Sequence, residues 1–230
     1  MSNKEEIIVI NLDQRPDRFE QFKKDFSKFD FLTITRFPAI LGYGSIACSN
    51  SHYQAFKQQM LKGDDIAIIF EDDCVPTPEF ETLFMKVVKW ARSNLEKWDY
   101  INLSPSSVNY FGRYPITLER LSEYIFTTSR CNAANLVIYN KSILPLFELH
   151  QIMITGNTED VVRRIGDQCF SDFFFGDINN TPTLKRCICY PSLAYQRADF
   201  SNINQSFSDY KYLFDKCNND IETYLKEKKI

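Results

Sequence analysis

The sequence predicts an α/β protein, a single domain with a central, mostly parallel sheet flanked by helices. Short apolar runs rich in β-branched residues alternate along the chain with segments whose apolar residues recur every three or four positions. The chain has 230 residues, of which 44% are hydrophobic, so it can bury one substantial core. No internal repeat or low-complexity tract interrupts the alternation. Strands that alternate with helices favour helical layers packed on one sheet.

In the first half of the chain, strands are expected at residues 6–12, 33–37 and 66–70. The helix after the first strand begins at Pro16, and its apolar face carries Phe19, Phe22, Phe26 and Phe29. The second helix is expected to begin at an N-cap serine, either Ser49 or Ser51, and to end at Gly63. A third helix follows Pro78, and its expected inward residues are Phe80, Leu83, Phe84, Val87, Val88 and Ala91.

In the second half, strands are expected at residues 99–103, 124–127, 135–139 and 186–190, and helices at 142–150 and 160–169. Residues 104–115 form a loop rich in Ser, Pro, Gly and Tyr, and loops of this length are often functional. We divide the chain into a main α/β domain at residues 1–205 and a polar, helical tail at residues 206–230.

Charge and composition exclude some classes of function. The net charge is −3, from 27 basic and 30 acidic residues, so no basic excess indicates nucleic-acid binding. The sequence shows neither a secretory signal nor the roughly 18 consecutive apolar residues of a membrane span. We therefore expect a cytoplasmic protein. Lys226, Lys228 and Lys229 could hold the tail at a partner or an anionic membrane, but a solvated helix end is the simpler interpretation.

The seven cysteines are expected to be reduced thiols, because their number is odd and no secretory signal accompanies them. Cys187 and Cys189 are separated by one residue, no CxxC pair occurs, and the chain has two histidines. These features argue against a structural zinc site.

The sharpest chemical feature is IAIIF-EDD-CVP, in which three acids directly follow an apolar strand. Ligands of open α/β sheets bind beyond the carboxyl ends of strands, and adjacent carboxylates repel one another unless water or a cation offsets them. Carboxylate oxygens suit Mg²⁺ or Mn²⁺. In an extended segment Glu71 and Asp73 would point the same way and Asp72 the other. Asp73 is therefore the first-choice metal ligand, Glu71 contributes directly or through water, and Asp72 is a candidate donor contact. The competing interpretation is that the acids only solvate a turn.

The turn after the first strand is the second candidate, as a cradle for a nucleotide. Asn11 and Leu12 end the strand, and Arg15 or Arg18 could bind phosphate through two hydrogen bonds. Ala39, after the second strand, is expected at the same edge. No GxGxxG occurs there, so a dinucleotide site is not supported. Alternatively, both arginines are solvated charges at the start of a helix.

Two further segments could contact the sugars. His52, near the expected start of the second helix, is either structural or a contact for an anion or the donor sugar, and Gln196 could bind donor phosphate or sugar. The segment FSDFFFGD places Asp172 among aromatic residues, which stack on sugar rings while an acid accepts a proton from an acceptor hydroxyl. Asp167 is the competing base, and a helix of core aromatics with incidental acids is the structural alternative.

Several of these segments together resemble glycosyltransferase family 25, which includes lipopolysaccharide and procollagen galactosyltransferases. VINLDQRPDRFEQF is similar to the family's opening strand and turn, and ACSNSHYQAF to its Gly-Cys-x-x-Ser-His stretch, with Ala47 in place of Gly. IAIIFEDDCVP resembles its Leu-Glu-Asp-Asp-Val segment, a version of the metal-binding Asp-x-Asp motif. SRCNAANLVIYNKSILPLF and CYPSLAYQRADFSNI resemble later segments, and the order is kept from Ile8 to Ile203.

The resemblance implies a GT-A fold, a UDP-sugar donor, a Mn²⁺ (or Mg²⁺) cofactor and inversion at the anomeric carbon. It also implies a glycan, glycoconjugate or protein acceptor, and it favours Asp172 over Asp167 as the base, because its distance to Pro191 suits the family better. Two other functions stay open: a nucleotidyltransferase, which would attack phosphorus, and an inactive carbohydrate-binding module of the same fold. We see no Gly-rich, Lys-bearing phosphate loop for the first, and the intact EDD argues against the second.

Overall fold

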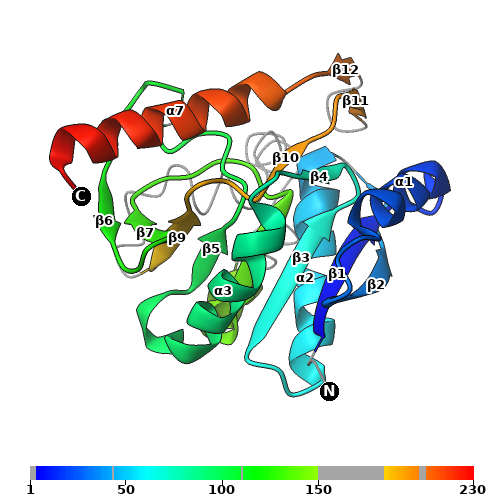
Figure 1. The fold of residues 1–230 in the computed structure, drawn as a ribbon. Helices are drawn as coiled ribbons and strands as arrows, with labels where there is room; N and C mark the ends of the chain where they lie inside the picture. The colour runs from blue at the N-terminus through cyan, green and yellow to red at the C-terminus, as the bar shows by residue number, and fades with distance from the viewer. Residues whose placement is uncertain (1–3, 43, 110, 150–183, 202–205) are drawn as a thin grey trace.

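The computed structural model describes residues 4–42, 44–109, 111–149, 184–201 and 206–230. Within them, helices lie on both faces of an eight-stranded sheet (Figure 1). The helices are α1 (Pro16–Phe26), α2 (Gly44–Leu61), α3 (Phe80–Ser93) and α7 (Lys211–Lys228), with 3-10 turns η1 (Leu95–Lys97) and η2 (Lys141–Ile143). The strands are β1 (Glu5–Asn11), β2 (Leu32–Pro38), β3 (Ile66–Glu71), β4 (Cys74–Pro76), β5 (Tyr100–Asn102), β6 (Leu118–Arg120), β7 (Ile125–Thr128), β8 (Leu136–Asn140), β9 (Arg186–Cys189), β10 (Ala194–Gln196), β11 (Asp199–Ser201) and β12 (Ser206–Ser208).

The strand order of the large sheet is β2-β1-β3-β8-β5-β9-β7-β6. Strand β1 pairs in parallel with β2 and β3, and β5 pairs in parallel with β9. Strand β8 runs antiparallel to β3 and β5, and β7 runs antiparallel to β9 and β6. Six of the eight strands therefore run in one direction, which confirms the predicted α/β fold with a mostly parallel sheet.

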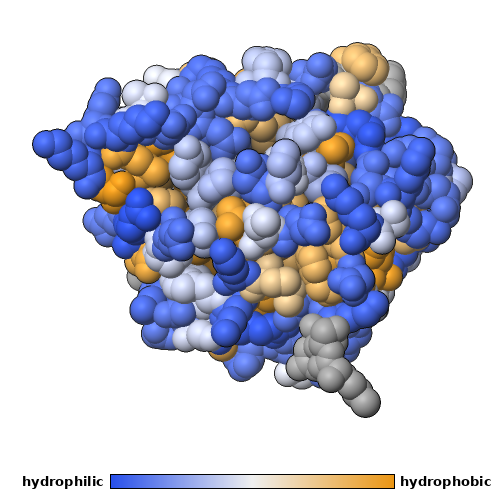
Figure 2. Space-filling view, viewed as in Figure 1, coloured by the Kyte–Doolittle hydropathy of each residue, from blue (hydrophilic) through white to orange (hydrophobic). Residues whose placement is uncertain are grey.

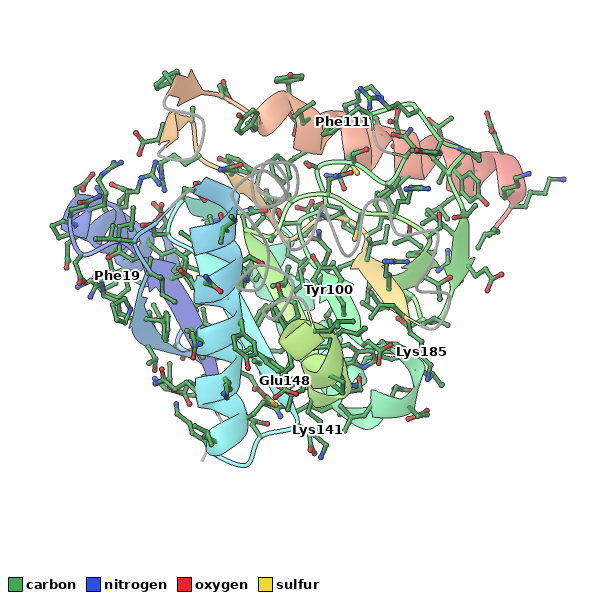
Figure 3. All side chains as sticks on the ribbon, turned by 180° about the vertical axis from the view of Figure 1, so that it is seen from behind. Phe19, Tyr100, Phe111, Lys141, Glu148 and Lys185 are labelled. Carbon is green, nitrogen blue, oxygen red and sulfur yellow. The ribbon has the colours of Figure 1, made fainter. Side chains whose placement is uncertain are left out.

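The core forms two layers, one on each face of the sheet. Successive residues of a strand point to opposite faces, so Ile7 and Val9 of β1 enter one buried cluster while Ile8 and Ile10 enter the other. Helices α1 and α3 cover the first face, and all six residues of α3 that were expected to point inward are buried there. Helices α2 and α7 contribute to the second. Seen from behind, α2 crosses the sheet and Tyr100 lies in the interior (Figure 3).

The expectation that Ser49 or Ser51 caps the second helix is wrong, because α2 begins at Gly44. The Ser51 hydroxyl donates to the Ala47 carbonyl at 2.7 Å, one turn back along the helix, and accepts from the Ile40 amide at 2.9 Å. A serine can stay inside a helix when its hydroxyl bonds to that carbonyl. Phe29 was expected on the first helix but follows its end at Phe26, and it is still buried in the same core.

The last part of the chain returns to the middle of the molecule. Strand β10 pairs with β4 antiparallel, and Figure 1 shows the two side by side beyond the end of β3. Neither strand was expected from the sequence pattern, and each has only three residues. The expected helical tail is helical from Lys211, after the short strand β12. The helix expected at 142–150 is present as η2 and the helical residues 144–149, while the one expected at 160–169 lies outside the described residues.

The face shown in Figure 2 is largely polar, and the described cysteines form no disulfide. Polar residues cover most of the face in Figure 2, including the outward side of α7. Among the described residues, no helix combines the length and the apolar character needed to cross a bilayer. None of the six cysteines in this part of the chain forms a disulfide, as expected; they are Cys48, Cys74, Cys131, Cys187, Cys189 and Cys217.

Candidate active site

The candidate site forms where β1 and β3 end side by side. These strands are parallel neighbours, and Ile10 of β1 pairs with Glu71 of β3. The residues that follow each strand therefore emerge at the same edge of the sheet. This register brings the turn after Asn11 to the acidic segment at residues 71–73, two segments that the sequence analysis had selected separately.

The three acids do not alternate as an extended chain would. Glu71 is the last residue of β3, Asp72 and Asp73 form a turn, and β4 begins at Cys74. Arg18 lies near both aspartates, with its Nη1 3.3 Å from Asp72 Oδ1 and 3.9 Å from Asp73 Oδ2. Glu71 instead contacts residues of α2. The turn breaks the two-residue periodicity, so Glu71 Oε1 faces α2 while Asp73 Oδ2 faces β10, and the strict alternation expected of an extended segment does not hold.

Asp72 is fixed by residues of the first turn. The Asn11 side-chain amide donates to Asp72 Oδ2 at 2.7 Å and to the Arg15 carbonyl at 2.8 Å. Burial raises the pKa of Asp72, although the Asn11 hydrogen bond and the Arg18 charge oppose this rise. Asn11 is itself buried, so it ties the end of β1 to the acidic turn.

Asp73 has one oxygen held and one unsatisfied. Gln196 of β10 donates to Asp73 Oδ2 at 2.9 Å, and the Arg197 amide donates to the Asp73 carbonyl at 2.7 Å. Asp73 Oδ1 is buried and has no hydrogen-bond partner among the residues that the structure describes. Burial and the charges of Glu71 and Asp72 raise the pKa of the Asp73 carboxyl to about 7. A buried acceptor without a donor is costly, so this oxygen is the strongest indication of a missing positive ligand.

Both arginines of the first turn are held by one carboxylate from the end of the chain. Asp199 Oδ2 accepts from Arg18 Nε at 2.9 Å and from Arg15 Nη2 at 3.1 Å. Arg15 also pairs with Asp17 at 2.9 Å. Both arginines are therefore paired with carboxylates rather than merely solvated at the start of a helix, and Arg18 also contacts the acidic turn.

The remaining predicted residues of this edge shape the backbone. The Leu12 carbonyl accepts from the Arg15 amide at 2.9 Å, and the Ala39 amide donates to the Asn11 carbonyl at 2.9 Å. Arg36 of β2 donates through Nε to Asn11 Oδ1 at 2.8 Å. Leu12 and Ala39 are partly exposed, and both lie next to Asn11, Leu12 in sequence and Ala39 through its backbone hydrogen bond.

Glu71 faces a histidine and a cysteine of α2. His52 Nε2 lies 3.2 Å from Glu71 Oε1, and Cys48 Sγ lies 3.5 Å from the same oxygen. The other ring nitrogen, Nδ1, lies 3.2 Å from the Tyr139 hydroxyl. The expectation that His52 lies near a helix N-terminus is wrong, because α2 begins at Gly44. Burial opposes the effect, but the His52 and Cys48 contacts lower the pKa of Glu71.

The structure brings ten of the twelve predicted site residues to this edge or its immediate surroundings, and Asp167 and Asp172 lie outside the described residues. The sequence analysis did not select Asp199 or Arg36. Asp199 lies in a segment quoted for the family resemblance, but its partners are 181 and 184 residues away, so no local spacing indicates the contact.

The residues at the acidic turn fit a hard divalent cation. Asp73 Oδ1 is a carboxylate oxygen without a donor, and two further carboxylates lie beside it. Oxygen ligands of this kind suit Mn²⁺ or Mg²⁺. A cation there would satisfy the buried oxygen and offset the charge of the two aspartates, which Arg18 contacts at 3.3 Å and 3.9 Å.

Comparison with known proteins gives a family match. The sequence model of glycosyltransferase family 25, described as an LPS biosynthesis protein, matches residues 31–156, which is more than half of the chain. No curated protein matches the sequence.

Three solved structures illustrate the structural similarity. A glycosyltransferase involved in glycosylation of the major capsid of PBCV-1 is 9% identical, with a TM-score of 0.49, 93% of this chain covered and 98% of that one. A mannose-1-phosphate geranyltransferase from Thermus thermophilus is 8% identical, with a TM-score of 0.46 and coverages of 85% and 74%. A UDP-glucose pyrophosphorylase is 8% identical, with a TM-score of 0.45 and coverages of 94% and 81%.

Proposed function

The chain belongs to glycosyltransferase family 25, and from this membership we propose that it moves a hexose from a UDP-sugar to a glycan, glycoconjugate or protein acceptor. The proposed reaction depends on Mn²⁺ or Mg²⁺ and inverts the anomeric carbon. The donor lies over the carboxyl ends of β1 and β3, and a single in-line displacement releases UDP.

The environment of Asp73 Oδ1 is the observation that best supports this proposal. This oxygen is buried and without a donor among the described residues, while the other oxygen of the same carboxylate is held by Gln196. Asp73 is therefore the proposed metal ligand, and Glu71 contributes directly or through water. A bound divalent cation supplies positive charge against the diphosphate that leaves, where such stabilisation is worth most.

The first turn and β10 provide the remaining donor contacts in this proposal. Asp199 holds the guanidinium groups of Arg15 and Arg18 together, and either group can bind a phosphate oxygen through its N–H donors. Asn11 keeps Asp72 in place and thereby fixes the turn that carries Asp73. Gln196 donates a hydrogen bond to Asp73. A donor held at this carboxylate through the metal would therefore also lie within reach of Gln196.

The proposed base is Asp172, with Asp167 as the competing residue. The base accepts the proton of the acceptor hydroxyl as its oxygen attacks the anomeric carbon from the face opposite the leaving diphosphate. Exchanging each aspartate for asparagine distinguishes the two, because the variant that lacks the base loses turnover while it still binds UDP.

The proposed reaction is tested by its product. The purified chain is incubated with Mn²⁺ and each of several UDP-sugars, with and without candidate acceptors, and UDP and pyrophosphate are both quantified. Release of UDP that stops when EDTA removes the metal is expected. NMR of the transferred sugar then gives the anomeric configuration, which should be opposite to that of the donor.

Three outcomes would contradict the proposal in different ways. Release of pyrophosphate would indicate a nucleotidyltransferase. Tight UDP binding without turnover of any sugar would indicate a binding module. Undiminished UDP release in excess EDTA would remove the metal from the mechanism.

A further inference from the structure

A second group of metal-ligating side chains lies beside the acidic turn, with a different chemistry. Cys48 and His52 of α2 and Glu71 of β3 converge so that one ligand atom of each lies within 4.8 Å of the others. They offer one sulfur, one nitrogen and one oxygen. Soft and borderline ligands of this kind favour zinc-like cations over Mn²⁺ or Mg²⁺. We propose that Cys48, His52 and Glu71 bind a zinc-class divalent cation at a site separate from the Asp73 oxygen.

The separations fit three corners of a tetrahedron around such an ion. Zinc bonds of about 2.0–2.3 Å to N, O and S place neighbouring ligand atoms roughly 3.3–3.7 Å apart. His52 Nε2 and Cys48 Sγ lie 3.2 Å and 3.5 Å from Glu71 Oε1. The third separation, between sulfur and nitrogen, also stays within 4.8 Å. Three protein ligands leave the fourth corner for water or a small ligand.

Helix α2 and strand β3 already position the three side chains next to one another. Cys48 and His52 are four residues apart on α2, so both side chains lie on one face of the helix. Glu71 ends β3, which packs against that helix. The sequence argued against a structural zinc site from the spacing of cysteines and histidines, and such spacing says nothing about an acid 19 residues beyond His52.

An outer contact holds the histidine in the orientation that a metal needs. Tyr139 of β8 lies with its hydroxyl 3.2 Å from His52 Nδ1, which leaves Nε2 directed at Glu71. Metal-bound histidines commonly have their second nitrogen fixed by such a partner. His52 is 1% exposed, whereas the Glu71 side chain is 22% exposed, so an ion can enter from the Glu71 side.

This inference does not require the transfer reaction. It assigns Oε1 of Glu71 to the zinc-class site and leaves the unsatisfied oxygen of Asp73 to the proposed donor metal. Binding requires the thiolate form of Cys48, so the thiol proton passes to solvent when the ion binds.

Cobalt(II) gives a direct test with the full chain. Thiolate bound to Co²⁺ produces a sulfur-to-metal charge-transfer absorption that oxygen ligands do not produce. Metal-stripped protein titrated with Co²⁺ should show this band; Zn²⁺ should abolish it and Mn²⁺ should not. Cys48→Ser should remove the band, and Asp73→Asn should keep it. Tyr139→Phe should weaken Co²⁺ binding about 10- to 100-fold, as loss of an outer contact does.

A band that is absent in the wild-type protein, or one that persists in Cys48→Ser, would overturn the proposal and leave the three residues as a hydrogen-bonded group. Alkylation of wild-type protein provides a second readout if Cys48→Ser does not fold. Zn²⁺ should slow iodoacetamide labelling of the Cys48 peptide on the order of tenfold, because the bound thiolate is shielded. Equal labelling with Zn²⁺ and with Mn²⁺ would also overturn it. Failure of UDP release affects none of these measurements, so the two proposals fail separately.

Discussion

Acidic side chains lie at both edges of the sheet, but they pair closely with cations at one edge and are buried with incomplete pairing at the other. At the edge where β1 and β3 begin, each of these acids is in close contact with a cation: Glu5 and Asp64 each bind one nitrogen of Arg92 at 2.8 Å, and Glu6 contacts Lys62 at 2.5 Å. Lys141 contacts Asp65 at the same edge, which is the lower edge in Figure 3. At the other edge, Asp72 and Asp73 are nearly buried and share Arg18.

The pKa values show what this difference means. The Lys62 hydrogen bond lowers the pKa of Glu6, and contact with Arg92 lowers that of Asp64 despite burial. Burial raises the pKa of Asp72 and takes that of Asp73 to about 7. An ionised carboxyl group therefore stabilises the fold where a cation pairs with it, and it lowers the stability where burial is not offset by such a pair. The costly edge is the one suited to take up a positive ligand.

The largest effect should come from exchanging one aspartate at each edge. Asp73→Asn removes the unsatisfied carboxylate oxygen and should reduce the rate of UDP release by at least about 100- to 1,000-fold, the usual effect of deleting one electrostatic stabiliser. Asp64→Asn, the matched control, should leave the rate unchanged and lower the free energy of unfolding by no more than about 1 kcal/mol. Equal rates in the two variants would refute the distinction between the edges.

Metal binding should stabilise only one edge. At a Mn²⁺ concentration about 100 times its dissociation constant, mass action adds roughly 3 kcal/mol, which corresponds to a rise in Tm of roughly 5–10 °C for a chain of this size. The rise should be present in wild type and Asp64→Asn and absent in Asp73→Asn. Differential scanning fluorimetry in stripped buffer measures it, and a full shift in Asp73→Asn would place the ion elsewhere.

The pH dependence of stability should have opposite signs at the two edges. Asp73 has a folded-state pKa above its unfolded value, so the metal-free protein should lose stability as the pH rises from about 4 to about 7. Asp73→Asn should flatten this decline by several degrees of Tm. Glu6 and Asp64 have lowered folded-state pKa values, so their contribution is present at neutral pH and is lost as the pH falls below about 4. Thermal melts in EDTA across this range measure Tm against pH for both proteins. If the Asp73→Asn curve runs parallel to the wild-type curve, the decline does not come from Asp73.

The smallest effect should come from the exposed pair at the cation-matched edge. Lys62→Met breaks the contact with Glu6 and should change the free energy of unfolding by less than about 1 kcal/mol, because solvent and salt screen such pairs. Urea titrations measure the change, and high salt should reduce it. A loss several times larger would show that this edge is as sensitive as the acidic turn.

The sequence predicted the parts of this contrast that local patterns encode. The apolar runs of β1 and β3, and the inward residues of α3, follow directly from periodicity, and they place Asn11 and the three acids at strand ends. The start of α2 was missed because Ser51 satisfies its hydroxyl inside the helix instead of capping it. The direction of Glu71 was missed because a turn replaced extended backbone.

Other parts of the site depend on contacts that no window of sequence contains. Gln196 and Asp73 were both selected, but their contact was not predicted, since the two meet only through the pairing of β10 with β4. Arg36 reaches Asn11 from the neighbouring strand β2, 25 residues along the chain, and Asp199 reaches Arg18 from 181 residues away. Strands of three residues, such as β4 and β10, are also too short to produce a period that can be distinguished from a loop.

The clasp formed by Gln196, Arg197 and Asp199 also has a consequence for biosynthesis. These residues hold Asp73 and the two arginines of the first turn, although the ribosome adds them long after β1 and β3 have emerged. A nascent or prematurely terminated chain that stops before Gln196 would contain most of the sheet and all three acids. It would lack the residues that form hydrogen bonds with Asp73 and with the two arginines. The earliest-made segment therefore acquires these side-chain contacts only after residue 199 has been synthesised.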